Sequence, residues 1–229
     1  MQIDLTGPAG RLEAQLETPR TPPRFAAFIC HPHPLRGGEM NNPATYRLAK
    51  AVRAQGGLAL RFNFRGVGKS EGVHAGGAGE VADARAALDW LAREHAALPR
   101  LACGYSFGAW IALDAAREDA SVVGVLCAGL PIALIDGAAT AAQRLDRAVA
   151  VVQAEQDQFG PPAELESALA SAGAPRRISV VKGTTHLFAG ELPALEREAT
   201  LALGWLLERA GLTPADSPAA PATSRQPPG

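Results

Sequence analysis

Ser106 lies at the centre of Gly104-Tyr105-Ser106-Phe107-Gly108, a G-x-S-x-G pattern. An apolar run, residues 101–105, precedes the serine, and a helical pattern, residues 107–117, follows it. This order predicts a strand, a sharp turn and a helix, with the serine hydroxyl exposed at the carboxyl end of the strand. The Phe107 amide, at the start of the helix, would face an oxyanion formed at Ser106. The pattern indicates nucleophilic acyl-transfer chemistry; the structural alternative is a glycine-bounded turn with a capping serine.

A serine nucleophile needs a base, and the base needs an acid that orients it. His186 follows the strand predicted at 177–181, and Asp157 follows the strand predicted at 148–154. Both residues are therefore expected at the same carboxyl edge of the sheet as Ser106. The chain order Ser, Asp, His is that of α/β-hydrolases rather than of the chymotrypsin or subtilisin types. Asp136 and Glu155 are the competing candidates for the acid.

The loop of residues 30–42, after the first core strand, should supply a second amide to the oxyanion. Its two prolines, Pro32 and Pro34, have no N–H, so His33 or Leu35 is the donor, and we prefer His33. The ring of His33, with that of His31, could instead bind a metal. Two histidines are too few ligands, however, and no neighbouring pattern completes a site, so we expect no metal.

The segment 63–70 ends in Gly-Lys-Ser, as phosphate-binding loops do. That motif requires a glycine at position 63, where this chain has Asn63, so the nucleotide hypothesis fails. Arg36 and Lys69 lie in loops at the expected active edge. We predict that they are either contacts for an anionic group of a substrate or ordinary surface charges.

Around these residues, short apolar runs alternate with amphipathic segments. Strands are expected at 24–30, 58–64, 101–105, 122–128, 148–154 and 177–181, and helices at 43–55, 79–95, 107–117, 162–172 and 191–210. Most of the runs are too uniformly apolar for a sheet with one wet face. The alternation predicts a mostly parallel sheet with helices on both faces, an α/β-hydrolase type of α/β fold. Residues 2–5 and 11–16 are expected to add an antiparallel hairpin at the edge.

The composition limits the possible partners. The chain has 229 residues, and 22 basic and 23 acidic side chains give a net charge of −1. We therefore expect no nucleic-acid partner and no membrane association, and a small-molecule substrate is expected instead. Three cysteines and no visible signal sequence favour free thiols in the cytoplasm. We assign residues 1–211 to one domain and the Pro/Ala-rich residues 212–229 to a disordered tail.

The segments HPHPLRGGEMNN, RFNFRGVGKSEG and CGYSFGAW, with the loops of Asp157 and His186, resemble a group of small bacterial α/β-hydrolases known as predicted hydrolases. This group is distantly related to dienelactone hydrolase and to small serine esterases. The resemblance implies a Ser106, His186 and Asp157 triad, with the His33 and Phe107 amides as oxyanion hole. Ala154 departs from the pattern, because the family usually has glycine three residues before its acid.

The resulting hypothesis is a serine hydrolase that cleaves esters or thioesters of small or short-chain acyl groups without a cofactor. Residues 129–147 leave room for one short helix and no large lid. An acyltransferase or peptidase with the same triad and a non-catalytic binding protein on this fold are the alternatives. The sequence makes no prediction of oligomeric state.

Overall fold

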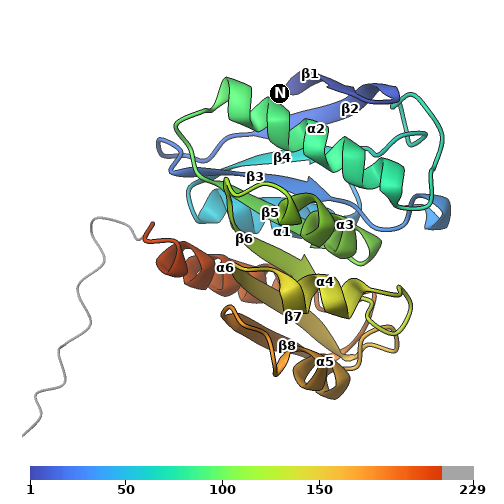
Figure 1. The fold of residues 1–229 in the computed structure, drawn as a ribbon, viewed down its shortest axis with the longest axis vertical. Coiled ribbons are helices and arrows are strands. Elements are labelled where there is room, and N and C mark those ends of the chain that lie inside the picture. The colour runs from blue at the N-terminus through green and yellow to red at the C-terminus, as the bar shows by residue number, and fades with distance from the viewer. Residues whose placement is uncertain (213–229) are drawn as a thin grey trace, which may run out of the picture.

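The computed structural model describes residues 1–212 and shows an eight-stranded sheet (Figure 1). The strand order is β1-β2-β4-β3-β5-β6-β7-β8. β1 and β2 form an antiparallel hairpin, β2 also runs antiparallel to β4, and all other neighbours are parallel. The strands are β1 Gln2–Gly7, β2 Gly10–Glu17, β3 Phe25–Cys30, β4 Gly57–Phe62, β5 Arg100–Tyr105, β6 Val122–Ala128, β7 Ala148–Gln156 and β8 Arg176–Thr185. The predicted α/β-hydrolase fold is confirmed.

Within residues 1–212, six α-helices cover the two faces of the sheet. They are α1 Pro43–Ala54, α2 Ala78–Glu94, α3 Phe107–Arg117, α4 Ala138–Arg144, α5 Pro162–Leu169 and α6 Leu192–Arg209, and a 3-10 turn, η1 Pro34–Arg36, precedes α1. In Figure 1, α2, α3, α4 and α5 lie in front of the sheet, and α1 and α6 lie behind it. The core is accordingly two apolar clusters, one on each face.

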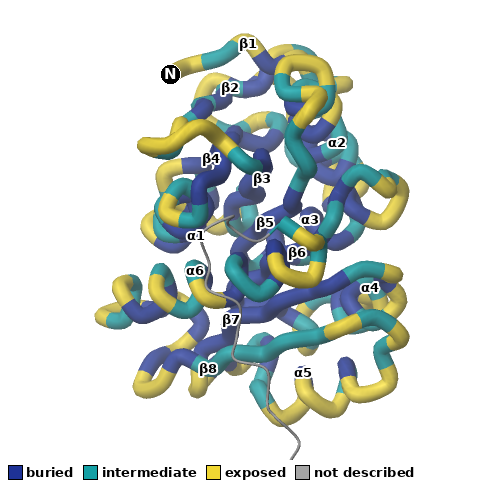
Figure 2. Tube along the Cα trace, turned by 90° about the vertical axis from the view of Figure 1, so that its left-hand side faces the viewer, coloured by how far each residue is buried: buried dark blue, intermediate teal, exposed yellow. Residues whose placement is uncertain are grey.

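The alternation of side chains along β3 shows how one strand serves both clusters. Phe25, Ala27 and Ile29 pack with α1 and α6, whereas Ala26, Phe28 and Cys30 pack with α2 and α3. All six residues are buried, as expected for a central parallel strand covered on both faces. Figure 2 shows the same arrangement, with buried strands inside and exposed residues on the outer sides of the helices.

The boundaries of most core strands differ from the sequence prediction, by one residue in β3 and β5 and by more in β4, β7 and β8. β4 ends at Phe62, so Asn63 and Phe64 begin the following loop. β8 continues to Thr185, four residues beyond the predicted end. Glu155 of β7 holds the extension, since its carboxylate accepts hydrogen bonds from the Lys182 ammonium (2.8 Å) and the Gly183 amide (2.9 Å).

Two other expectations concern the cysteines and the chain end. Cys30, Cys103 and Cys127 are free and buried, as predicted. Within residues 1–212, no helix combines the length and the apolar character needed to cross a bilayer. The predicted tail, apart from Leu212, lies outside the described residues.

Candidate active site

Ser106 occupies a strained turn between β5 and α3. Its backbone angles are φ 56° and ψ −124°, and only one other non-glycine residue of the described chain, Phe188, has a positive φ. Such a conformation is costly and persists only where its surroundings fix it. A Cβ at Gly104 would lie 2.0 Å from the Gly108 carbonyl oxygen, and one at Gly108 would lie 2.4 Å from that of Cys30. The two glycines therefore permit the tight approach that exposes the serine.

His186 lies beside Ser106, and Asp157 lies on the far side of the His186 ring. The Ser106 Oγ is 2.8 Å from His186 Nε2, and His186 Nδ1 is 2.8 Å and 3.0 Å from the two carboxylate oxygens of Asp157. The carboxylate oxygens can only accept, so Nδ1 carries the proton and Nε2 is free to accept the serine proton. The structure thus brings together the three residues that the sequence singled out. Neither competing acid bonds to His186: Glu155 pairs with Lys182, and Asp136 lies in the loop before α4.

The histidine itself is held on several sides. The Tyr105 hydroxyl donates a hydrogen bond to the carbonyl oxygen of His186 (2.9 Å), and its ring stacks on the imidazole. The ring of Phe159 meets the imidazole edge-on, with 4.9 Å between centroids. Burial, and then the charge of Asp157, raise the pKa of Tyr105, so the phenol stays protonated and remains a donor. His186 is only 5% exposed, which limits the rotamers open to it.

Gln153, on β7, orients the acid, and the sequence analysis did not identify it. Its side-chain amide donates to Asp157 Oδ2 (2.9 Å) and to the Gly160 carbonyl (2.8 Å), while its oxygen accepts from the Leu130 amide (2.9 Å). The Phe159 amide donates to Asp157 Oδ1 (3.0 Å). A polar residue inside the apolar run AVAVVQA was the signal that could have revealed this role.

The loop around Asp157 forms although Ala154 replaces the glycine of the resembling family. Ala154 is fully buried at the end of β7, and its carbonyl accepts a hydrogen bond from the Asp157 amide (3.3 Å). The alanine therefore fits the turn that presents the carboxylate to His186.

Two backbone amides beside Ser106 are unengaged. Within residues 1–212, neither the His33 nor the Phe107 N–H donates a hydrogen bond to another protein group. The alternative donor, the Leu35 amide, points at the His33 ring, whose Nδ1 lies 3.2 Å away. His33 and Phe107 both line the cavity that contains Ser106. This arrangement favours His33 over Leu35 as the second amide.

His31 has a structural role instead. Its Nε2 accepts the Phe64 amide (3.0 Å), so its Nδ1 carries the proton and donates to the Pro32 carbonyl (2.7 Å). Burial lowers the pKa of His31 to about 4, which keeps the ring neutral. Both ring nitrogens are occupied, and the part of the chain that the structure describes contains no cluster of three metal-ligating side chains.

A cavity of about 700 Å3 opens above Ser106. It is lined by Pro32, His33, Arg36, Asn42, Gly76, Tyr105, Ser106, Phe107, Trp110, Pro131, Leu134, Ile135, Asp136, Phe159, His186 and Leu187. Arg36 is on this wall, as predicted from its loop. Lys69 is not, which corrects the expectation for that residue: its loop turns back to the hairpin, where Glu13 accepts the Lys69 amide (2.9 Å).

The cavity has no large cover. The connection between β6 and β7 contains only the seven-residue helix α4. Leu134 and Leu187 remain 60% and 68% exposed at the rim, so the mouth is open and apolar.

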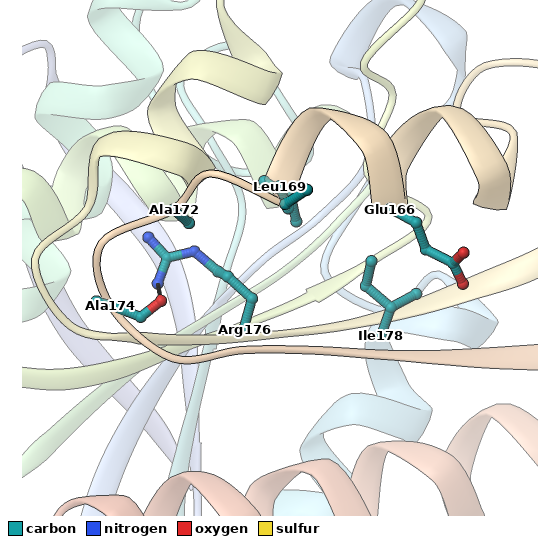
Figure 3. A pocket seen from close by; sticks show the side chains of 7 residues that line it. Glu166, Leu169, Ala172, Ala174, Arg176 and Ile178 are labelled. Carbon is teal, nitrogen blue, oxygen red and sulfur yellow. Dashed lines mark hydrogen bonds between the residues drawn. The ribbon is translucent and has the colours of Figure 1, made fainter.

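A second cavity, of about 450 Å3, lies between α5 and β8 (Figure 3). Its cation, Arg176, donates to six backbone carbonyls, including those of Ala142, Gln143 and Leu145 at the end of α4. Because its guanidinium is already saturated with acceptors, Arg176 stabilises this corner of the fold rather than offering a contact to a ligand.

The fold and this geometry define an α/β hydrolase with a serine at the nucleophile position, and comparisons with known proteins agree. The family described as serine aminopeptidase S33 matches residues 36–136. The structure of an α/β serine hydrolase homologue from Coxiella burnetii is 33% identical, covers 89% of this chain and 97% of that chain, and has a TM-score of 0.83. The chain belongs to the α/β serine hydrolase family.

Three further similarities complete this comparison. An α/β serine hydrolase without a lid from Xanthomonas campestris is 26% identical, with a TM-score of 0.81 over 92% of this chain and 94% of that chain. A dienelactone hydrolase from Anabaena variabilis, 19% identical over 89% of this chain and 95% of that one, shares the fold (TM-score 0.72). An uncharacterized protein of Rickettsia prowazekii is 46% identical over 114 residues. This match spans 49% of the chain and 48% of that relative.

Proposed function

We propose that the protein is a serine hydrolase that cleaves ester or thioester bonds of small or short-chain acyl substrates through an acyl-enzyme. The observation that carries the proposal is the continuous hydrogen-bond line from Ser106 Oγ through His186 to Asp157, with both contacts of the imidazole at 2.8 Å. A serine hydroxyl in this arrangement transfers its proton to the imidazole as it attacks a carbonyl carbon. We also assign the chain to the small predicted hydrolases whose HPHP segment supplies the oxyanion loop.

In the first half-reaction, Ser106 Oγ forms a bond to the carbonyl carbon while its proton moves to His186 Nε2. The carbonyl oxygen becomes an oxyanion, which the amides of His33 and Phe107 stabilise by about 3 kcal/mol each. Asp157 stabilises the imidazolium and keeps its orientation. The tetrahedral intermediate then collapses, the bond to the alkoxide or thiolate breaks, and His186 donates the proton to that leaving group.

In the second half-reaction, His186 removes a proton from a water molecule, whose oxygen attacks the acyl carbon. The second tetrahedral intermediate uses the same two amides. Its collapse breaks the bond to Ser106 Oγ, and the proton returns from His186 to the serine. The product is a carboxylic acid, and no step requires a cofactor.

The cavity supports the choice of substrate size. Its volume of about 700 Å3 is within the range of small-molecule sites. Trp110, Ile135 and Phe159 give it an apolar wall suited to an acyl chain, and its volume suits a short chain. Arg36 is the cation on this wall, and we propose that it binds a negatively charged group when the substrate carries one.

Fluorophosphonate labelling and hydrolysis of p-nitrophenyl esters from C2 to C12 test the proposal directly. We expect labelling and turnover in the wild type, both lost in Ser106→Ala, with the highest kcat/KM on the shorter chains. Ser167→Ala is the matched control, because Ser167 is an exposed serine on α5. Absence of labelling and of turnover in the wild type contradicts the proposal, as does a clear preference for long-chain emulsions.

A second candidate is an aminopeptidase with the same triad. Asp136, an exposed carboxylate on the cavity wall, could bind a free α-amino group, and the matching family is described as serine aminopeptidase. Hydrolysis of aminoacyl-p-nitroanilides separates the candidates. Turnover above that of the matched esters, with KM raised in Asp136→Asn, would favour the peptidase.

A further inference from the structure

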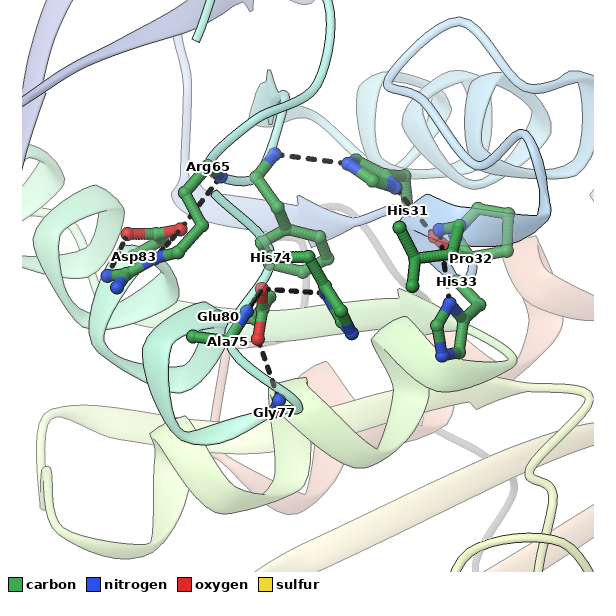
Figure 4. Close-up of polar contacts among 11 residues, drawn as sticks. His31, Pro32, His33, Arg65, His74, Ala75, Gly77, Glu80 and Asp83 are labelled. Atoms are coloured by element: carbon green, nitrogen blue, oxygen red, sulfur yellow. Dashed lines mark hydrogen bonds and ion pairs between the residues drawn. The ribbon is translucent and has the colours of Figure 1, made fainter. Parts of the chain in front are cut away.

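Glu80 is a buried carboxylate that the proposed mechanism does not use. It is the third residue of α2, and its side chain is fully buried. Oε2 accepts the Gly77 amide (2.7 Å) and Oε1 accepts the Ala75 amide (2.9 Å; Figure 4). Burial raises the pKa of Glu80, but these amides outweigh it and lower the pKa overall, so the group is an anion.

The carboxylate also lies against His74. His74 Nδ1 lies 2.9 Å from Glu80 Oε1, an ion-pair distance, although the angle is not that of a good hydrogen bond. The nearby cation, Arg65, is engaged elsewhere, since its guanidinium forms two hydrogen bonds with Asp83. The segment 72–77 is rich in glycine and has no helix or strand. Glu80 therefore contacts this segment at three points, by hydrogen bonds from Ala75 and Gly77 and by its close approach to His74.

His74 in turn packs against the residues proposed to form the oxyanion hole. Its ring centroid is 5.1 Å from that of His33 and 6.0 Å from that of Phe107. The His33 ring is also 4.8 Å from the Phe107 ring, so the three rings form one cluster (Figure 4 shows His33 and His74 side by side).

The orientation of the His33 ring is fixed from its other side as well. The Leu35 amide donates to Nδ1, so the proton of the neutral imidazole is on Nε2. Burial, and then the neighbouring His74 and Arg36, lower the pKa of His33 and favour this neutral form. Rotation of the ring would break the Leu35 hydrogen bond, which ties the ring to the backbone of the turn that carries the free His33 N–H.

We propose that Glu80 and His74 are positioning residues for the oxyanion hole: the buried carboxylate holds His74, and His74 holds His33 so that its amide faces Ser106. The inference rests on the proposed function, because it assigns a support to the site that stabilises the oxyanion. The two residues act through His33 and do not touch the substrate. Oxyanion amides of this kind contribute only when they are aligned with the developing charge, so a small displacement is expected to lower kcat rather than raise KM.

The test compares His74→Ala, His74→Phe and a matched control, His95→Ala. His95 directly follows α2, the helix that carries Glu80. Its ring packs on Trp90 and lies far along the chain from His33. Each variant is assayed for kcat and KM on a short p-nitrophenyl ester. The inhibition constant of a short alkylboronic acid, which forms a tetrahedral adduct with the serine, and that of the carboxylate product are measured in parallel.

We expect His74→Ala to lower kcat about 10- to 100-fold with KM within about twofold, a displacement effect of the size known for catalytic groups. Boronate affinity should fall in parallel, and product affinity should stay unchanged. His74→Phe, which keeps the ring packing but loses the contact with Glu80, should recover kcat in part, to within about three- to tenfold of the wild type. The control should match the wild type in every readout.

A folded His74→Ala variant with wild-type kcat and boronate affinity overturns the inference, and so does a His74→Phe variant as impaired as the alanine. Should His74→Ala fail to fold, Glu80→Gln decides, because glutamine keeps a capping side chain at the third helical position. Its kcat and boronate affinity should fall about three- to tenfold, and unchanged values reject the inference. A wild type that is neither labelled nor active refutes the proposed function itself, which distinguishes the two failures.

Discussion

Replacing Gln153 with leucine should damage both stability and activity, because one buried side chain satisfies three partners. Leucine is similar in size but removes the acceptor of the Leu130 amide and the donors to Asp157 and Gly160. The Leu130 amide and the Gly160 carbonyl are left without a partner, at about 1–3 kcal/mol each, so we expect a loss of about 2–6 kcal/mol. That loss is a large part of the roughly 5–15 kcal/mol by which domains are stable.

The catalytic effect of Gln153→Leu should be smaller than that of removing the acid. Asp157 keeps its contacts with His186 and with the Phe159 amide, so the carboxylate loses one constraint and not its place. A misplacement on the order of 1 Å can cost about 100-fold, and we expect about tenfold in kcat.

Urea unfolding monitored by circular dichroism measures the loss of stability. Ester hydrolysis at a temperature where the variant is folded measures the change in kcat. Gln143→Leu is the control, because Gln143 forms its side-chain hydrogen bond with Ser171 at the surface. We expect the control to change stability by less than about 0.5 kcal/mol. A Gln153→Leu variant within about 1 kcal/mol of the wild type and with full kcat would refute the reasoning.

Three other perturbations have defined outcomes. Asp157→Asn should lower kcat by up to about 10⁴-fold in the ester assay with little loss of stability, because the amide favours the wrong tautomer of the histidine. The neutral, buried His31 has a pKa of about 4, below its unfolded value of about 6.5, so its stabilisation is present above pH 6.5 and is lost as pH falls toward 4. Urea unfolding at pH 7 and pH 4 should show about 3 kcal/mol less acid destabilisation in His31→Gln than in the wild type; equal losses would contradict this assignment. Gly104→Ala should abolish soluble expression or activity, because its Cβ would lie 2.0 Å from a backbone oxygen, whereas Gly173→Ala, with open space around it, should behave as wild type.

The sheet could be predicted because its signal is local. Uniformly apolar runs of six or seven residues, such as β3 and β6, have few alternatives to a strand that is covered on both faces. The extension of β8 could not be predicted in this way, since Lys182 and Gly183 look like a loop and are recruited by Glu155 of the neighbouring strand. That pairing depends on register between strands, which the composition of neither strand reveals.

The candidate triad could be predicted for a different reason. Parallel strands end at one edge, so residues that follow β5, β7 and β8 must meet there whatever lies between them. This argument failed for Lys69, although it follows β4, because its loop turns back to the antiparallel hairpin. Arg11 donates to the Lys69 carbonyl, and Glu13 accepts the Lys69 amide. The rule gives the edge at which a loop starts and not the direction in which it turns.

The residues that position the candidate site could not be predicted from the sequence. Their partners lie far apart in the chain, and such pairs produce no periodic sequence pattern. Gln153 contacts the Leu130 amide across 23 positions, and His74 meets His33 across 41. The arrangement of the proposed oxyanion hole likewise depends on a tertiary contact, between α3 and β3. A Cβ at Gly108 would lie within 2.5 Å of the carbonyl oxygens of both Cys30 and His31, so the start of α3 rests directly on the end of β3. Only this approach brings the free amides of His33 and Phe107 to one cavity. Any side chain at position 108 is therefore expected to separate the two proposed donors while leaving Ser106, His186 and Asp157 intact, which would make the glycine as important for the proposed oxyanion stabilisation as for the turn itself.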